Sequence, residues 1–146
     1  MLRALGWIPA DLSPATPPVR AYAGAWHLVL AVDRLEGLNQ LEYDFDALKS
    51  LMEREQVTTL QLVYRENDHV FHSRNPFPVG GVVEDPATGA AAAALGGYLR
   101  EKKLVQIPAH IHIRQGEAMG RPSRLEVEIP ESGGIIVSGT AVQIIE

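Results

Sequence analysis

The feature that most constrains this chain is the run of small and apolar residues from Ala90 to Leu99, which directly follows the polar turn Glu84–Gly89. A helix that is apolar on every side has to be covered by protein on every side. The run is too short to cross a membrane, which takes about 20 apolar residues. The sequence therefore predicts a buried central helix over about residues 88–102.

The start of this helix has the composition of an anion-binding helix N-terminus. Asp85, Thr88 and Gly89 are residue types found where unpaired backbone N–H groups point outward from a helix. Gly89 and Ala90 have small side chains, so a ligand can approach their N–H groups closely. Because the N-terminal end of a helix carries partial positive charge, we expect a small carboxylate-bearing substrate here. The Walker and Rossmann glycine spacings are absent, which excludes these nucleotide-binding loops.

A simpler interpretation of the same turn is a structural cap, with Asp85 as the N-cap and Pro86 at the first helical position. Thr88 and Gly89 favour the ligand-binding interpretation, because they supply more polar loop chemistry than a cap needs. Arg74 precedes the Pro-rich loop that leads to this turn. We expect it to brace that loop or to pair with Asp85.

Composition bounds the class of protein. The chain has 146 residues, 46% of them hydrophobic, which predicts one globular domain. A net charge of −5 argues against a nucleic-acid-binding protein. The absence of cysteine excludes disulfides, thiolate metal sites and cysteine nucleophiles. The first residues lack the pattern of a signal peptide, so we expect a cytoplasmic protein without membrane segments.

The rest of the chain predicts strands, one further helix and few long loops. An amphipathic outer helix is expected from Asp44 or Asp46 to about Gln56. The Pro-rich segment 9–18 is expected to be a linker, and residues 75–81 a loop. Strands are expected over residues 20–32 (one or two), 57–64, 69–74, 107–114, 125–129, 135–137 and 140–145.

These elements predict an α+β fold, in which a curved and largely antiparallel sheet wraps around the central helix. Gly96 and Gly97 lie inside that helix, where each costs about 1 kcal/mol relative to Ala. We therefore expect a neighbouring backbone to lie close to them.

A metal site is a separate hypothesis. His110 and His112 are two apart on an expected strand and so share a face, and Glu117 follows five residues later. The spacing resembles the first motif of cupin metal sites. The glycine expected before the histidines and the second, later histidine motif are both absent, so we expect no metal here.

Several motifs together resemble a known family. They are Gly-Gly-Val-Val-Glu-Asp-Pro-Ala-Thr-Gly-Ala-Ala at 80–91, Tyr-Leu at 98–99, Gln-Gly-Glu at 115–117, Met-Gly-Arg-Pro-Ser at 119–123, Gly-Gly-Ile at 133–135 and Gly-Thr-Ala-Val at 139–142. In this order and spacing they resemble the second half of the PhzF-like isomerases of phenazine biosynthesis, which have the diaminopimelate-epimerase-like fold. The resemblance runs from about residue 9 to residue 142.

The resemblance implies a protein of two similar halves, each a curved sheet around a central helix, with the active site between them. It implies proton transfer without a cofactor, with Asp85 at the position of an active-site aspartate. Thr88, Gly89 and Ala90 would form the cradle for a substrate carboxylate, although the family usually has Ser where this chain has Ala90.

The family protein is about twice as long, and the other half carries its principal catalytic glutamate. We therefore expect residues 1–146 to be a single domain equivalent to one half. A homodimer, or a separate polypeptide equivalent to the N-terminal half, would complete the site.

Three functions are thus open from the sequence. The first is an isomerase or epimerase domain that acts through Asp85. The second is a non-catalytic relic or interaction module that keeps the fold and the anion pocket. The third is a cupin-like metal enzyme that uses His110, His112 and Glu117.

Overall fold

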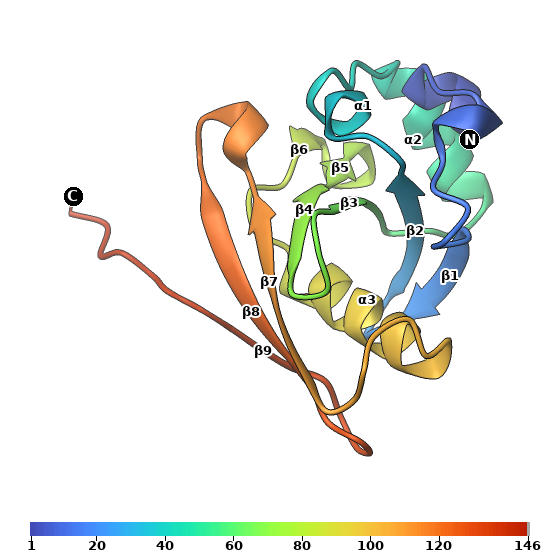
Figure 1. Cartoon of the computed structure of the whole chain (residues 1–146). Coiled ribbons are helices and arrows are strands. Elements are labelled where there is room, and N and C mark those ends of the chain that lie inside the picture. The colour runs from blue at the N-terminus through green and yellow to red at the C-terminus, as the bar shows by residue number, and fades with distance from the viewer. Residues whose placement is uncertain (146) are drawn as a thin grey trace.

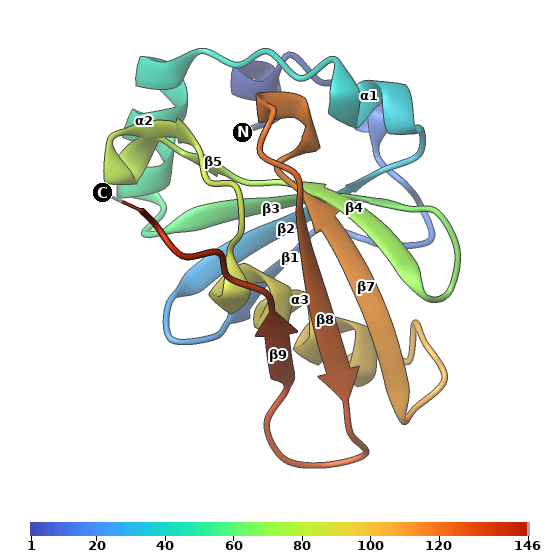
Figure 2. The same ribbon diagram turned by 90° about the vertical axis from the view of Figure 1, so that its left-hand side faces the viewer.

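A computed structural model describes residues 1–145 and contains one large curled sheet (Figures 1 and 2). Its strands are β1 (Val19–Tyr22), β2 (Trp26–Val32), β3 (Thr59–Arg65), β4 (Val70–Arg74), β7 (Ala109–Gln115), β8 (Ser123–Ile129) and β9 (Ile136–Gly139). They pair in the order β1-β2-β3-β4-β7-β8-β9. The pairs β2–β3 and β4–β7 are parallel and the others antiparallel. The α+β class, with a curved mixed sheet around one central helix, is confirmed.

The central helix is α3 (Gly89–Glu101), which lies in the hollow of the sheet (Figure 1). Ala92, Leu95 and Leu99 are fully buried on it. They pack against side chains that alternate inward along the strands, namely Val63, Phe71, Ile111, Ile113, Val127 and Ile129. Each fully buried Leu of this kind contributes roughly 1.5–3 kcal/mol to folding, so this contact holds the helix inside the sheet.

Coverage of α3 is less complete than the sequence predicts. Ala90 is exposed, and Ala93 and Gly97 are partly exposed. A Cβ on Gly96 would come within 2.9 Å of Ile135 Cγ2, whereas one on Gly97 would meet nothing within 4 Å. The expected close backbone approach is therefore wrong: side chains crowd Gly96, and Gly97 faces open space.

Two outer helices cover one part of the convex face, behind β2 and β3. The predicted amphipathic helix is α2 (Phe45–Arg54), whose first turn is capped by Asp44: its carboxylate accepts the Ala47 N–H at 2.9 Å. Leu48 and Met52 of α2 are fully buried against that face. The short helix α1 (Leu35–Asn39) was not predicted. Its five residues are too few to show helical periodicity.

A two-stranded ribbon leads to the start of α3. It consists of β5 (Pro76–Phe77) and β6 (Val82–Glu84), joined by a turn of 3₁₀ helix at Pro78–Gly80. The prediction of a plain loop over residues 75–81 is wrong, because the ribbon is short and two prolines hide its pattern. The Pro-rich segment 9–18 has one 3₁₀ turn at Pro9–Asp11 and then pairs with the end of β2, through the Leu12–Val32 bridge and a hydrogen bond from the Ser13 N–H to the Ala31 carbonyl at 2.8 Å.

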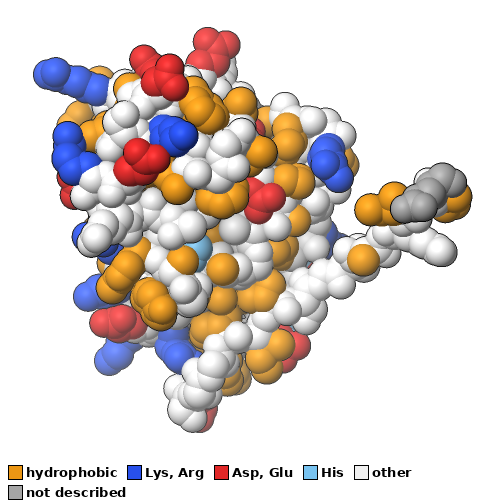
Figure 3. All heavy atoms as spheres, turned by 180° about the vertical axis from the view of Figure 1, so that it is seen from behind, with side chains coloured by type: hydrophobic (Ala, Val, Ile, Leu, Met, Phe, Trp, Pro, Cys, Tyr) orange, Lys and Arg blue, Asp and Glu red, His pale blue; other side chains and the backbone are white. Residues whose placement is uncertain are grey.

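The predicted strand over residues 140–145 is absent. After β9 the chain leaves the sheet and extends away from the body of the molecule (Figures 1 and 3). Val142, Ile144 and Ile145 are about nine-tenths exposed there, at 90%, 88% and 89%. Within residues 1–145 no helix is both long and apolar enough to cross a lipid bilayer.

Candidate functional site

The turn from Asp85 to Thr88 connects the ribbon to the exposed N-terminus of α3. The Asp85 N–H donates to the carbonyl of Asn75 at 2.9 Å, which ties the turn to the end of β4. The Thr88 hydroxyl donates to Asp85 Oδ2 at 2.5 Å. Thr88 is the N-cap residue of α3, yet its side chain does not cap the helix. Its hydroxyl serves the Asp85 carboxylate instead, so the simple cap interpretation does not describe this turn.

Gln115, at the end of β7, has a buried side chain that forms hydrogen bonds with this turn. Its Nε2 donates to the Asp85 carbonyl at 2.8 Å and to Thr88 Oγ1 at 2.9 Å. Its Oε1 accepts the Thr88 N–H at 3.3 Å and the Ser73 hydroxyl at 3.3 Å. Gln115 is fully buried. The amide therefore fixes both ends of the turn, and this role was not predicted.

A signal for Gln115 does exist in the sequence. Ile111, Ile113 and Gln115 alternate along β7 and all point inward. A polar residue on an otherwise apolar inward face needs a buried partner, because an unpaired buried amide costs several kcal/mol. The pattern marks the residue, but it does not reveal that the partner is the turn 27 residues away.

The next residue, Gly116, allows the turn to lie this close. Its φ is +80°, a left-handed conformation that favours glycine. A Cβ here would lie 2.1 Å from the Arg121 carbonyl oxygen and 2.9 Å from that of Pro86. Only glycine fits both the conformation and the contact, so Gly116 allows the Asp85 turn to lie close to the end of β7.

The N-terminus of α3 opens onto a groove. Gly89 and Ala90 are exposed, and no side chain caps the first turn of the helix within residues 1–145. The groove has a volume of about 710 Å³, and its lining includes Gly89, Arg121, Arg124 and Ser138. Free N–H groups at a helix start favour a negatively charged ligand, and so does a guanidinium group such as that of Arg121, whereas the guanidinium of Arg124 pairs with Glu126.

Arg74 pairs with Glu84 and not with Asp85. Its Nη2 lies 2.9 Å from Glu84 Oε2 and its Nε 3.1 Å from Oε1, a bidentate pair with both side chains largely buried. Nη1 also donates to the carbonyls of Leu38 and Leu41, at 3.1 and 3.2 Å. The prediction that Arg74 braces the loop is confirmed, and the alternative of an Asp85 pair is wrong.

A second layer of buried polar side chains lies behind Asn75. His27 Nδ1 lies 2.7 Å from Thr59 Oγ1, and Asn75 Nδ2 donates to Gln61 Oε1 at 3.1 Å. Burial lowers the pKa of His27, against a smaller raising effect from the Ala23 carbonyl. Since Asn75 is fully buried, this layer fixes the carbonyl that accepts the Asp85 N–H.

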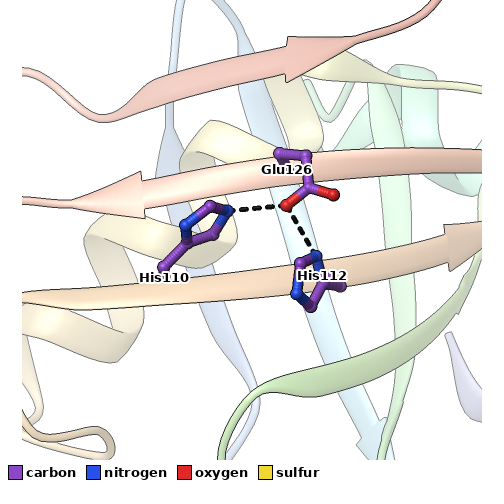
Figure 4. Close-up of side chains that lie close together, drawn as sticks. All are labelled: His110, His112 and Glu126. Carbon is purple, nitrogen blue, oxygen red and sulfur yellow. Dashed lines mark hydrogen bonds and ion pairs between the residues drawn. The ribbon is translucent and has the colours of Figure 1, made fainter.

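The histidine pair is not part of this site. His110 and His112 lie on the outer face of β7, where both contact Glu126 of β8 (Figure 4). Glu117 lies elsewhere, with Oε2 3.9 Å from His72 Nδ1. The metal set that the sequence suggested, with Glu117 as third ligand, is therefore not assembled in this form.

The structure places the four predicted site residues at one turn and the helix start that follows it. Asp85 and Thr88 are hydrogen-bonded to each other, and Gly89 lines the groove. Ala90 offers only its backbone N–H, at an exposed position of the first helical turn. The arrangement presents a carboxylate beside a set of N–H donors, which suits proton transfer next to a bound anion.

Comparison with known proteins finds relatives that are named as isomerases. An uncharacterized isomerase of Clostridium acetobutylicum is 30% identical over 99% of this chain and 51% of its own length. The trans-2,3-dihydro-3-hydroxyanthranilate isomerase of Pseudomonas aeruginosa is 30% identical over 100% of this chain and 51% of its own length. The chain thus spans about half the length of these curated relatives.

Solved structures of similar proteins have the same fold over most of this chain. A Pseudomonas aeruginosa protein described as a predicted epimerase superimposes with a TM-score of 0.78 at 29% identity, over 94% of this chain and 46% of its own. A Bacillus anthracis phenazine biosynthesis protein of the PhzF family gives a TM-score of 0.77 at 20% identity, over 95% and 50%. A family model for phenazine biosynthesis-like proteins matches residues 3–146. The chain therefore belongs to the phenazine biosynthesis-like (PhzC–PhzF) family.

Proposed function

We propose that this chain forms one half of the active site of an isomerase, which moves a proton on a small carboxylate-bearing substrate without a cofactor. The observation that carries the proposal is the Asp85 carboxylate, held by Thr88 at the exposed N-terminus of α3. The names of the relatives, which are isomerases, support the same reaction class.

Each residue of the turn has a distinct task in this proposal. The N–H groups of Gly89 and Ala90 bind the substrate carboxylate at the positive end of α3. Thr88 orients Asp85 through Oδ2, so that Oδ1 faces the substrate and takes up or returns the proton. Gln115 acts through the turn and is a positioning residue.

Proton transfer between two carbons needs a donor as well as an acceptor. In this proposal Asp85 supplies one of these groups, and a glutamate of the other half, which the resemblance to PhzF-like proteins implies, supplies the second. We propose that a second copy of this chain, or a separate polypeptide equivalent to the N-terminal half, closes the groove. Turnover by the chain alone is expected to be feeble or absent, and localisation in the cytoplasm stays a prediction.

A substrate class follows from the relatives. The Pseudomonas aeruginosa relative is named for trans-2,3-dihydro-3-hydroxyanthranilate, a cyclohexadiene amino acid with one carboxylate. A molecule of this class offers an anionic group for α3 and acidic C–H bonds for Asp85. It is therefore the first compound to test.

The test is exchange of solvent deuterium into that compound, followed by proton NMR in D₂O. Exchange in the presence of the chain together with an added N-terminal-half polypeptide, lost in Asp85→Asn, would support the proposal. Asp46→Asn, at an exposed position of α2, is the matched control and should exchange like the parent chain. Exchange that persists undiminished in Asp85→Asn would contradict the role of Asp85.

A second candidate is binding of the anion without proton transfer. Ala90 favours it, because PhzF-like proteins usually have Ser at this position and Ala supplies no hydroxyl group to a substrate. Saturable binding of the compound with no exchange, with the chain alone and with an added N-terminal-half polypeptide, would favour this candidate.

A further inference from the structure

The outer face of β7 and β8 differs from that of β2 and β3, because α1 and α2 do not cover it (Figure 2). Side chains alternate along both strands, so every second residue points away from α3. The outward residues are His110, His112 and Arg114 on β7 and Arg124, Glu126 and Glu128 on β8. This surface combines imidazoles and carboxylates on two rigid, paired strands.

Three of these side chains converge on one point. Glu126 lies directly opposite His112 in the antiparallel register. Its Oε2 is 2.6 Å from His112 Nδ1 and 2.6 Å from His110 Nε2 (Figure 4). The three ligand atoms all lie within 4.8 Å of one another. One oxygen thus faces two imidazole nitrogens.

We propose that His110, His112 and Glu126 bind a divalent transition-metal ion such as Zn²⁺ on the outer face of β7 and β8. Imidazole nitrogen and carboxylate oxygen are ordinary zinc ligands, with bonds of about 2.0–2.2 Å. Tetrahedral geometry at such bond lengths separates the ligand atoms by about 3.3 Å. The present 2.6 Å contacts therefore have to open by less than an ångström, which side-chain rotation provides.

Arg124 orients Glu126 for this role. Arg124 Nε, 2.8 Å from Oε1, holds the other oxygen and leaves Oε2 toward the histidines.

Arg124 also opposes the metal. Its Nη2 lies 3.0 Å from His112 Nδ1, where its charge repels a cation. Metal binding must displace this contact. Removal of the guanidinium is therefore expected to strengthen binding, whereas removal of a ligand weakens it. Removal of a carboxylate elsewhere on the surface distinguishes the loss of a ligand from a general loss of negative charge.

The site is open on one side. A hollow of about 350 Å³ next to His110 is lined by Pro108, His110, Glu128 and Ile136, among others. With three protein ligands, a fourth position stays free for water or a small anion. A bound ion would also link two neighbouring strands and so raise the thermal stability of the sheet.

The experiment is calorimetric titration of the tag-free full chain with ZnCl₂ at pH 7.5. We expect one saturable site per chain and a rise in Tm with added zinc. Glu126→Gln should weaken binding at least about tenfold, whereas Arg124→Gln should tighten it several-fold. Glu53→Gln, an exposed carboxylate on α2 and away from β7 and β8, is the control and should bind like the parent chain.

Circular dichroism checks that each variant is folded, and His110→Asn replaces Glu126→Gln if the latter does not fold, because His110 is half exposed. Absence of saturable binding to the parent chain would overturn the proposal. Binding that is unchanged in both ligand variants would also overturn it, because the ion would then lie elsewhere.

Discussion

Two regions of the concave sheet face hold α3 and the turn before it by different kinds of interaction. One, the apolar floor, consists of Val63, Phe71, Ile111, Ile113, Val127 and Ile129. The other, the polar corner, consists of His27, Thr59, Gln61, Ser73, Asn75 and Gln115, where β2 and β3 begin and β4 and β7 end. The floor packs against Ala92, Leu95 and Leu99 of α3, and the corner binds the turn before it through hydrogen bonds.

The difference shows how one sheet can both stabilise and orient a helix. Apolar contacts have no direction, so the floor holds α3 in place without fixing its rotation closely. Hydrogen bonds require distances of about 2.7–3.2 Å and near-linear angles, so the corner fixes the Asp85 turn. We infer that the floor contributes to stability without fixing the site, whereas the corner and the adjacent Gly116 contribute to both, and four predictions test this division.

The largest effect is expected for Gly116→Ala. The new Cβ would collide with two backbone carbonyls in a left-handed conformation, which should cost more than about 4 kcal/mol in unfolding free energy. Gly120→Ala is the matched control, because its φ is also positive, at +72°, but its Cβ would meet nothing within 4 Å. It should cost only about 1–2 kcal/mol. Urea denaturation measures both, and equal losses would show that the contact with the Asp85 turn is unimportant.

Leu95→Ala tests the apolar floor. Leu95 is fully buried, so the cavity should cost about 2–5 kcal/mol in unfolding free energy. Substrate binding by the folded fraction should change little, because Leu95 lies in the second turn of α3 and away from its N-terminus. Loss of binding in fully folded Leu95→Ala would contradict the division between floor and corner.

Gln115→Leu tests the polar corner with a side chain of similar size. It leaves the Thr88 N–H and the Asp85 carbonyl without their buried partner, which should cost about 1–3 kcal/mol. The rate of deuterium exchange should fall further than the loss of folded protein explains, because the turn loses the hydrogen bonds of Gln115. Ser73→Ala removes only one hydrogen bond to Gln115 and serves as the milder control. Full exchange by Gln115→Leu would show that the amide does not position Asp85.

The smallest effect concerns pH. Burial lowers the pKa of His27, so the unfolded chain binds a proton more readily than the folded one. Stability from this residue is fully present above the unfolded pKa of about 6.5 and is lost as pH falls toward the lower folded value. The unfolding free energy should therefore decline between pH 7.5 and 5, and less so in His27→Gln. His69→Gln, at an exposed position, should keep the parental slope.

The sequence predicted the elements whose pattern is local. The alanine run predicted α3, and Asp44 followed by spaced apolar residues predicted α2. Short elements were missed or wrong, because α1 and the β5–β6 ribbon have too few residues to show a period. The apolar segment 140–145 has the pattern of a strand but has no partner strand within the described residues.

The site was predictable to a similar degree. Asp85, Thr88 and Gly89 stand together in the sequence and form one turn in space. Asn75 reaches that turn through the β5–β6 ribbon, in which Pro76 lies opposite Glu84, and Gln115 reaches it only because β4 and β7 pair in parallel. No local pattern contains this pairing, so tertiary structure is needed to identify the residues that support the turn.

The central claim is that a carboxylate binds at the N-terminus of α3 beside Asp85. Titration of the ¹⁵N-labelled chain with trans-2,3-dihydro-3-hydroxyanthranilate tests it most directly through amide chemical shifts. We predict saturable shifts centred on Gly89, Ala90 and Ala91, which persist in Asp85→Asn because the N–H groups remain. Saturable shifts centred on another surface, or none at concentrations that support exchange, would contradict the claim.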